Sequence, residues 1–356
     1  MRFRTAVPLV LLAALLSPGC GKKGGILPPL VLRPRPVEKL SAVQRGSRFV
    51  LEWQDPTESV DGTELAGLSE AEIWLEIRPD PPPASGLPGA FGDRAKRVGT
   101  LTPPLTPGPE TFEYAFDPKA WKGKAFVFAV RTRESSKRRL SEFSNEALVR
   151  PRAVPNPPSQ IRTRVLQDRI ELAWTAPAAN FDGSVPAAVR GYTVYRAEKD
   201  GARTRISAQP VREPAFADRA FEFGRAYAYI VRSVTDPGPG FVESDDSTAA
   251  EVKPADTFPP AAPAGLSIAA GPDFLSLAWD ASPEKDLAGY LVWRWVGDDA
   301  KNYIRLTKTP ILETAFTDRS VEKGKSYTYF VTAVDTAGNE GARSAVVSET
   351  IKDPKP

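Results

Sequence analysis

GKSYTYFV at residues 324–331 has two counterparts earlier in the chain, GRAYAYIV from Gly224 and GKAFVFAV from Gly123. The three glycines lie 101 and 100 residues apart. Aromatic and β-branched residues recur in these stretches with a period of two, which is typical of a strand with one buried face. A period of about 100 residues is the size of one small domain. The spacing therefore predicts three similar β-domains in tandem.

Each repeat contains two more strand-like blocks before this stretch. The first ends in tryptophan: FVLEW at Trp53, IELAW at Trp174 and LSLAW at Trp279. The second is AEIWLEIR at 71–78, AVRGYTVYR at 188–196 and LAGYLVWR at 287–294. The shared order of blocks predicts an all-β chain.

An early tryptophan, a central Tyr-Arg strand and a late Gly-x-x-Tyr-x-Tyr-x-Val strand resemble the fibronectin type III domain, a seven-stranded β-sandwich. The resemblance covers nearly all of the chain after the amino-terminal segment. It implies a structural role in the core for Trp53, Trp174 and Trp279, and a tyrosine corner bonded to the backbone for Tyr227 and Tyr327. The first repeat has Phe126 at that corner and a proline-rich insertion from Pro79 to Pro109, so it is the degenerate copy.

Proline clusters mark the expected boundaries between the repeats. We expect domains at 34–150, 151–253 and 254–353, after a signal peptide at 1–19 and a tether at 20–33. These segments account for the chain and leave no room for a catalytic domain.

The amino terminus has the layout of a secretory signal. Arg2 and Arg4 precede an apolar run from Ala6 to Leu16, which is too short to span a bilayer. Ser17-Pro18-Gly19-Cys20 resembles the lipobox of bacterial lipoproteins, although Ser17 stands where leucine is usual. The resemblance implies lipidation of Cys20 and export. Gly21 in place of aspartate implies sorting to the outer membrane in a Gram-negative host. The alternative is an ordinary signal cleaved elsewhere, with Cys20 free or removed.

Composition excludes several classes of function. The chain has no histidine, which excludes His-dependent triads, imidazole bases and His-containing zinc sites. The single cysteine excludes an internal disulfide and multi-cysteine metal sites. The net charge of +3 falls to +1 without Arg2 and Arg4, so no global polyanion-binding charge exists. The sequence therefore predicts a non-enzymatic protein with no cofactor, no metal and no nucleic-acid partner.

An aromatic face in the third repeat is the main candidate binding surface. Alternation places Tyr290, Val292 and Arg294 on the inner face of one strand. The outer face would carry Leu291, Trp293 and Trp295, joined by Phe330 from the neighbouring strand. Exposed tryptophans suit protein hot spots or sugar stacking. Packing of the two tryptophans against another part of the chain is the alternative.

A second, weaker candidate is a basic cluster in the first repeat. Its five members could bind anionic groups at a sandwich end: Arg131, Arg133, Lys137, Arg138 and Arg139. A solvated loop is the alternative. The oxygen-rich loop from Asp335 to Glu340 matches no known calcium-binding spacing.

Together these features predict a lipid-anchored envelope protein whose repeats act as a spacer and a protein-binding or adhesion module. The competing prediction is a carbohydrate-binding module that uses the aromatic face. Its partners would be the membrane, through the lipid, and an envelope protein or glycan.

Overall fold

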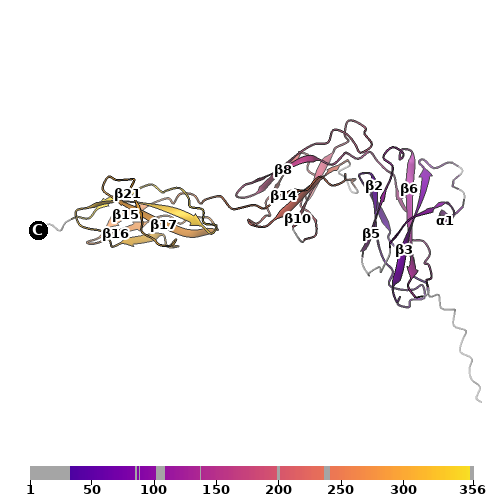
Figure 1. The fold of residues 1–356 in the computed structure, drawn as a ribbon, viewed down its shortest axis with the longest axis horizontal. Helices are drawn as coiled ribbons and strands as arrows, with labels where there is room; N and C mark the ends of the chain where they lie inside the picture. Colours follow the sequence, from indigo (N-terminus) through magenta and orange to yellow (C-terminus); the bar gives the residue numbers. More distant parts are fainter. Residues whose placement is uncertain are drawn as a thin grey trace, which may run out of the picture. The chain divides into compact units, whose positions relative to one another are not determined.

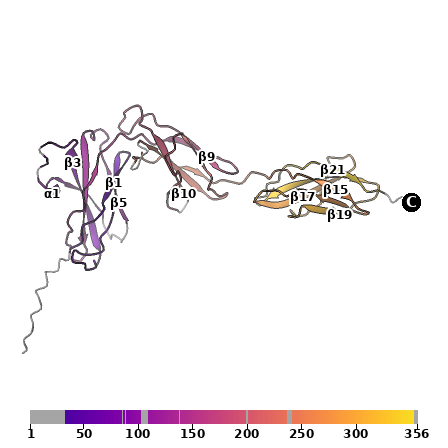
Figure 2. The same cartoon turned by 180° about the vertical axis from the view of Figure 1, so that it is seen from behind.

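The computed structural model describes residues 33–352, except 85, 88, 102–108, 137, 199–200 and 236–240 (Figures 1 and 2). The chain forms two compact units. The first comprises the described residues up to Val43, then Val50–Tyr114 and Gly123–Arg150. The second comprises Gln44–Phe49, Ala115–Lys122 and the chain from Pro151 onward. Cys20 and the rest of the tether up to residue 32 lie outside the described residues, which begin at Arg33.

The first repeat folds into a three-stranded and a four-stranded antiparallel sheet. The three-stranded sheet has the order β1 (Ser41–Arg45), β2 (Arg48–Gln54), β5 (Pro109–Ala115). The four-stranded sheet has the order β4 (Lys96–Leu101), β3 (Leu68–Pro79), β6 (Lys124–Glu134), β7 (Ala147–Val149). The insertion also contributes a short helix, α1 (Phe91–Arg94).

The second repeat has the same sheet orders. Its smaller sheet is β12 (Ala215–Asp218), β9 (Ile170–Thr175), β8 (Ser159–Val165). Its larger sheet is β11 (Thr204–Arg205), β10 (Gly191–Glu198), β13 (Tyr227–Val234), β14 (Ala250–Val252).

The third repeat has them again. The smaller sheet is β15 (Ser267–Ala270), β16 (Leu275–Ala278), β19 (Ala315–Asp318). The larger sheet is β18 (Ile304–Arg305), β17 (Leu287–Val296), β20 (Ser326–Asp335), β21 (Val347–Thr350). The predicted all-β fold of tandem sandwiches is confirmed.

Strand alternation places the repeated aromatic residues in the cores. Trp174 packs edge-on against Tyr192 at 5.2 Å, and Trp279 packs in the same way against Tyr290 at 5.4 Å. Trp53 is buried as well. The backbone amide of Glu222 donates a hydrogen bond to the hydroxyl of the buried Tyr227 at 2.9 Å. In the same way the amide of Glu322 donates to the buried Tyr327 at 2.8 Å.

A buried ionic group recurs in the cores of the second and third sandwiches. Arg294 donates to Asp318 at 2.6 Å, and Tyr329 donates to the same carboxylate oxygen at 2.8 Å. The second sandwich repeats this arrangement with Arg196, Tyr229 and Asp218. The arginine and the tyrosine are register partners on neighbouring strands. The first sandwich has Leu75 and Phe128 at these two positions.

Along one side of each larger sheet, a serine hydroxyl accepts the hydrogen bond of a strand amide in place of a backbone carbonyl. The amides of Val130, Val231 and Val331 each donate to a serine Oγ at 3.0 Å, on Ser144, Ser247 and Ser344 respectively. Each hydroxyl in turn donates to the carbonyl of the next residue. In the second and third sandwiches the opposite side is closed in the same way, by Ser207 and Thr307.

Candidate interaction face of the third sandwich

One outer position of the larger sheet is aromatic in every sandwich. Trp74, Tyr195 and Trp293 occupy it, each beside the corresponding residue of the neighbouring strand, Ala129, Ile230 and Phe330. This register makes the three outer faces directly comparable. Each face is completed by different groups.

In the first sandwich the insertion covers this face. Phe91 of α1 meets Phe143 edge-on at 5.4 Å, and Phe143 meets Trp74 edge-on at 5.5 Å. Phe91 belongs to a buried cluster with Val127 and Ala129 of β6. Arg94 at the end of the helix pairs with Glu76 on β3. The proline-rich insertion therefore folds back and closes the surface.

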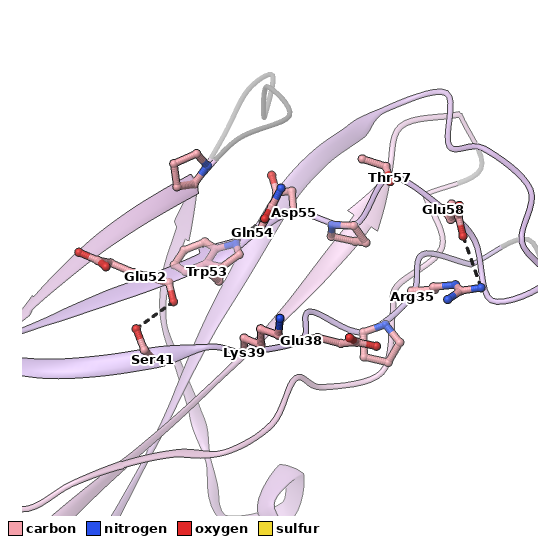
Figure 3. A pocket seen from close by; sticks show the side chains of 13 residues that line it. Arg35, Glu38, Lys39, Ser41, Glu52, Trp53, Gln54, Asp55, Thr57 and Glu58 are labelled. Carbon is pink, nitrogen blue, oxygen red and sulfur yellow. Dashed lines mark hydrogen bonds and ion pairs between the residues drawn. The ribbon is translucent and has the colours of Figure 1, made fainter.

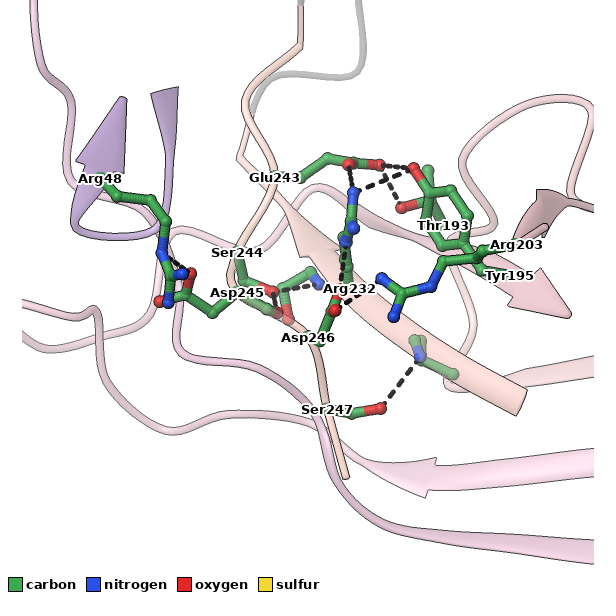
Figure 4. Close-up of polar contacts among 12 residues, drawn as sticks. Arg48, Thr193, Tyr195, Arg203, Arg232, Glu243, Ser244, Asp245, Asp246 and Ser247 are labelled. Atoms are coloured by element: carbon green, nitrogen blue, oxygen red, sulfur yellow. Dashed lines mark hydrogen bonds and ion pairs between the residues drawn. The ribbon is translucent and has the colours of Figure 1, made fainter. Parts of the chain in front are cut away.

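In the second sandwich a network of charged groups completes the face (Figure 4). Glu243 accepts hydrogen bonds from Tyr195 at 2.7 Å and from Arg232 at 2.6 Å. Arg232 also pairs with Asp246 at 2.6 Å, and its guanidinium lies 4.5 Å from the Tyr195 ring centre. Burial opposes ionisation of Glu243, but its hydrogen bonds outweigh that cost and hold the pKa of the carboxyl below its usual value. The charged groups of this face are thus paired with one another within the sandwich.

In the third sandwich the face is an aromatic cluster of Trp293, Trp295, Tyr303 and Phe330. Phe330 lies at its centre, parallel to Trp293 at 5.8 Å and tilted against Trp295 at 6.2 Å. Tyr303 meets both Phe330 and Trp293 edge-on, at 5.5 and 5.6 Å. Trp293 and Trp295 are half-buried, and Tyr303 is 38% exposed.

Two of the four predicted binding residues are buried. Phe330 is 1% exposed and Leu291 is 5% exposed, so the prediction that they form part of an exposed surface is wrong. Phe330 is covered because the tryptophans, Tyr303 and the guanidinium of Arg343 surround it. We conclude that Phe330 supports the face from beneath.

Two arginines lie over the aromatic cluster. The Arg343 guanidinium is 4.3 Å from the Tyr303 ring centre, and that of Arg305 is 6.0 Å from the Trp293 ring centre. The Trp293 indole N–H donates to Thr332 at 3.0 Å, and Thr332 donates to Glu340 at 2.6 Å. A shallow hollow of about 350 Å³ runs from Trp293 to Arg343. Trp293, Trp295 and Tyr303 all keep part of their rings accessible, and Tyr303 is the one in the exposed class.

Sequence reasoning missed Tyr303, Arg305 and Arg343. Tyr303 and Arg343 come from the connections that follow β17 and β20, and Arg305 comes from the edge strand β18. Arg305 could have been placed beside Trp293 only from the register of β17 with β18, which the sequence alone does not give.

The described members of the predicted basic cluster are divided between strand β6 and the turn that follows it. Arg131 and Arg133 lie on β6 and pair with Glu72 of β3 at 2.6 and 2.9 Å. Assigning these two to an anion-binding loop is therefore wrong, because their charges are satisfied on the sheet. Arg138 and Arg139 are exposed, and their carbonyls accept hydrogen bonds from Arg133 and Glu134 at the end of β6. Lys137 lies outside the described residues.

Three carboxylates approach one another at one end of the third sandwich. Oxygen atoms of Asp256, Asp286 and Asp335 lie within 4.8 Å of one another. Both oxygens of Asp335 accept hydrogen bonds from Asn339, at 2.8 Å each. These bonds stabilise the oxygen-rich loop from Asp335 to Glu340.

No helix among the described residues is long and apolar enough to cross a membrane. Predicted lipidation at Cys20 falls on residues that the structure does not describe.

The chain is similar in part to a curated protein and to a solved structure. No family model matches the chain. Over 187 residues, 51% of this chain, it is 33% identical to Exoglucanase B of Cellulomonas fimi. That match spans only 15% of the exoglucanase. A crystal structure of the chicken CNTN1 FN1–FN3 domains covers 90% of this chain and 99% of its own, with 14% identity and a TM-score of 0.27.

The fold follows from the sheet orders themselves. A three-stranded sheet and a four-stranded sheet with the same strand order occur in all three repeats. Antiparallel two-sheet packing around alternating inward residues defines this class of sandwich. The chain is a tandem array of fibronectin type III-like β-sandwiches.

Proposed function

We propose that this chain is a non-enzymatic, lipid-anchored envelope protein in which the first two sandwiches act as spacers and the third binds a protein partner. The supporting observation is the contrast among three equivalent faces. The insertion closes the first and an ionic network completes the second. The third leaves Trp295 and Tyr303 partly exposed, and Arg343 lies over Tyr303. Aromatic and arginine side chains are the residues most enriched in binding hot spots.

A capture experiment tests the protein-binding proposal. A soluble version beginning at Gly21 would be incubated with envelope extract, beside a Trp295→Ala, Tyr303→Ala variant. We expect the variant to lose at least 90% of the captured partner, because each truncation of a central aromatic residue costs about 2 kcal/mol or more of binding free energy.

Leu312→Ala provides the matched control, since Leu312 is an exposed apolar residue of the same sandwich. It should capture as much as the parent, and all versions must unfold cooperatively. Equal capture by the parent and the double variant would contradict the assignment of the face.

A glycan is the second candidate ligand for the same face. The similarity to an exoglucanase favours it, because such an enzyme acts on glucan chains. The rings of Trp295 and Tyr303 would then stack on sugars. Titration with soluble glucan oligosaccharides separates the candidates: saturable binding lost in the double variant indicates a glycan, whereas no binding alongside capture of a protein indicates a protein partner.

The proposed anchor depends on Cys20. We expect Cys20→Ala to release the chain from the membrane fraction, because each buried methylene of an acyl chain contributes about 0.8 kcal/mol and two chains already hold a protein stably. Fractionation, together with incorporation of labelled fatty acid, measures this. Ser17→Ala should remain anchored, and membrane retention of the Cys20 variant would contradict the proposal.

A further inference from the structure

Asp55 is a buried carboxylate in the wall of a hollow in the first sandwich (Figure 3). Asp55 is only 7% exposed. The indole N–H of Trp53 donates to Oδ1 at 3.0 Å. Among the residues that the structure describes, Oδ2 has no hydrogen-bonding partner. A buried charge left half-satisfied is costly, so its retention calls for an explanation.

The fold does not need an acid at this position. The residue two places after the core tryptophan is Ala176 in the second repeat and Ala281 in the third. Trp174 and Trp279 are buried there without a hydrogen-bonding partner for the indole nitrogen among the described residues. The sandwich therefore forms with alanine at the position of Asp55, and the acid is a feature of the first repeat alone.

The surroundings of Asp55 are acidic. The hollow has a volume of about 560 Å³, within the usual range of small-ligand sites, and its charged lining residues are Arg35, Glu38, Lys39, Glu52, Asp55 and Glu58. Arg35 pairs with Glu58 at 3.4 Å, which leaves Glu38, Glu52 and Asp55 facing the single charge of Lys39. Burial and the nearby Glu110 raise the pKa of Asp55 to about 6, against the hydrogen bond from Trp53. The hollow therefore favours a positively charged occupant.

We propose that this hollow is a binding site for an organic ammonium group, with Asp55 as its counter-ion. An ammonium group supplies up to three hydrogen-bond donors, which suits a carboxylate that lacks one. A divalent metal fits less well. The one group of three acids close enough to share an ion among the described residues is that of Asp256, and it does not include Asp55.

The indole N–H resonance of Trp53 reports on the site, because that group is bonded to Asp55. We expect n-butylammonium and spermidine, added to the full chain at pH 7, to shift this resonance saturably, while n-butanol does not. The indole resonances of Trp174 and Trp279 should stay in place. Between pH 7 and pH 5 the ionised fraction of a carboxyl with a pKa of about 6 falls about tenfold, so the apparent affinity should fall about tenfold too.

Two variants make the test decisive. Asp55→Ala, which matches the other repeats, should fold and lose saturable binding. Asp61→Ala removes an exposed carboxylate of the same sandwich and should bind like the parent. Binding that survives in Asp55→Ala, falls equally in Asp61→Ala, or occurs equally with butanol would overturn the proposal.

Discussion

Replacing Asp318 with alanine is expected to destabilise the third sandwich by about 3 to 5 kcal/mol, because removal of one partner of a buried ion pair leaves the other charge uncompensated. Arg294 is 8% exposed, and its guanidinium would lose the carboxylate at 2.6 Å. Tyr329 would lose its acceptor as well. Hydrogen exchange of β17 and β20 amides in the full chain, read by mass spectrometry, measures the loss in this sandwich alone.

The first sandwich supplies the control for this experiment. Its residues Leu75 and Phe128 show that the core tolerates an apolar pair at these positions. A triple variant, Asp318→Ala with Arg294→Leu and Tyr329→Phe, should therefore recover most of the lost stability. A single variant as stable as the parent, or a triple variant less stable than the single one, would show that the ion pair is not what the core depends on.

The same carboxylate predicts a dependence on pH. Burial opposes ionisation of Asp318, but hydrogen bonds from Ser320, Tyr329 and Arg294 outweigh it and hold its pKa below the usual value. A depressed pKa stabilises the fold above the unfolded value of about 3.9, and this contribution is lost as the pH falls further. The difference in stability between the parent and Asp318→Ala should accordingly be full at pH 7 and narrow below about pH 4.

Phe330→Ala is expected to cost about 3 to 5 kcal/mol as well, which is the usual range for truncating a buried phenylalanine. The ring is 1% exposed and is contacted by Trp293, Trp295 and Tyr303, so its removal opens a cavity beneath the whole face. Chemical denaturation of the full chain, followed by exchange of the β20 amides, provides the measurement.

The stability lost by Phe330→Ala should be compared with that lost by Trp295→Ala. Because Trp295 is half-buried, its truncation should cost clearly less than that of Phe330, about 1 to 2 kcal/mol. If both variants lost equal stability, Trp295 would be a packing residue and the proposed partner face would lose one of its accessible rings.

Much of the fold could be predicted from the sequence, because alternation along a strand is a local property. The strands around Trp174 and Tyr227 have regularly alternating inward apolar residues, and Gly224 lies in the turn before the second of them. The burial of Phe330 could not be predicted in this way. It depends on Arg343 and Tyr303, which reach the ring from separate loops.

The first repeat shows the same limit. Its insertion is recognisable by its prolines, but nothing local indicates that Phe91 folds back over β6. Likewise, Arg131 and Arg133 look like part of a basic loop until β6 is paired with β3 and Glu72 comes within reach. Pairing between distant strands decides which charges remain available.

The serine hydroxyls beside each larger sheet bear on how copies of such a chain behave when crowded. An open row of backbone donors and acceptors invites another strand to add, which is a route to aggregation. At Val130, Val231 and Val331 the amide is already bonded to a hydroxyl of the chain's own next segment. The backbone amide of the same serine donates back to the carbonyl of the valine, and the segment then continues into the next strand of the sheet. These three amides are therefore not available to a strand added from another molecule.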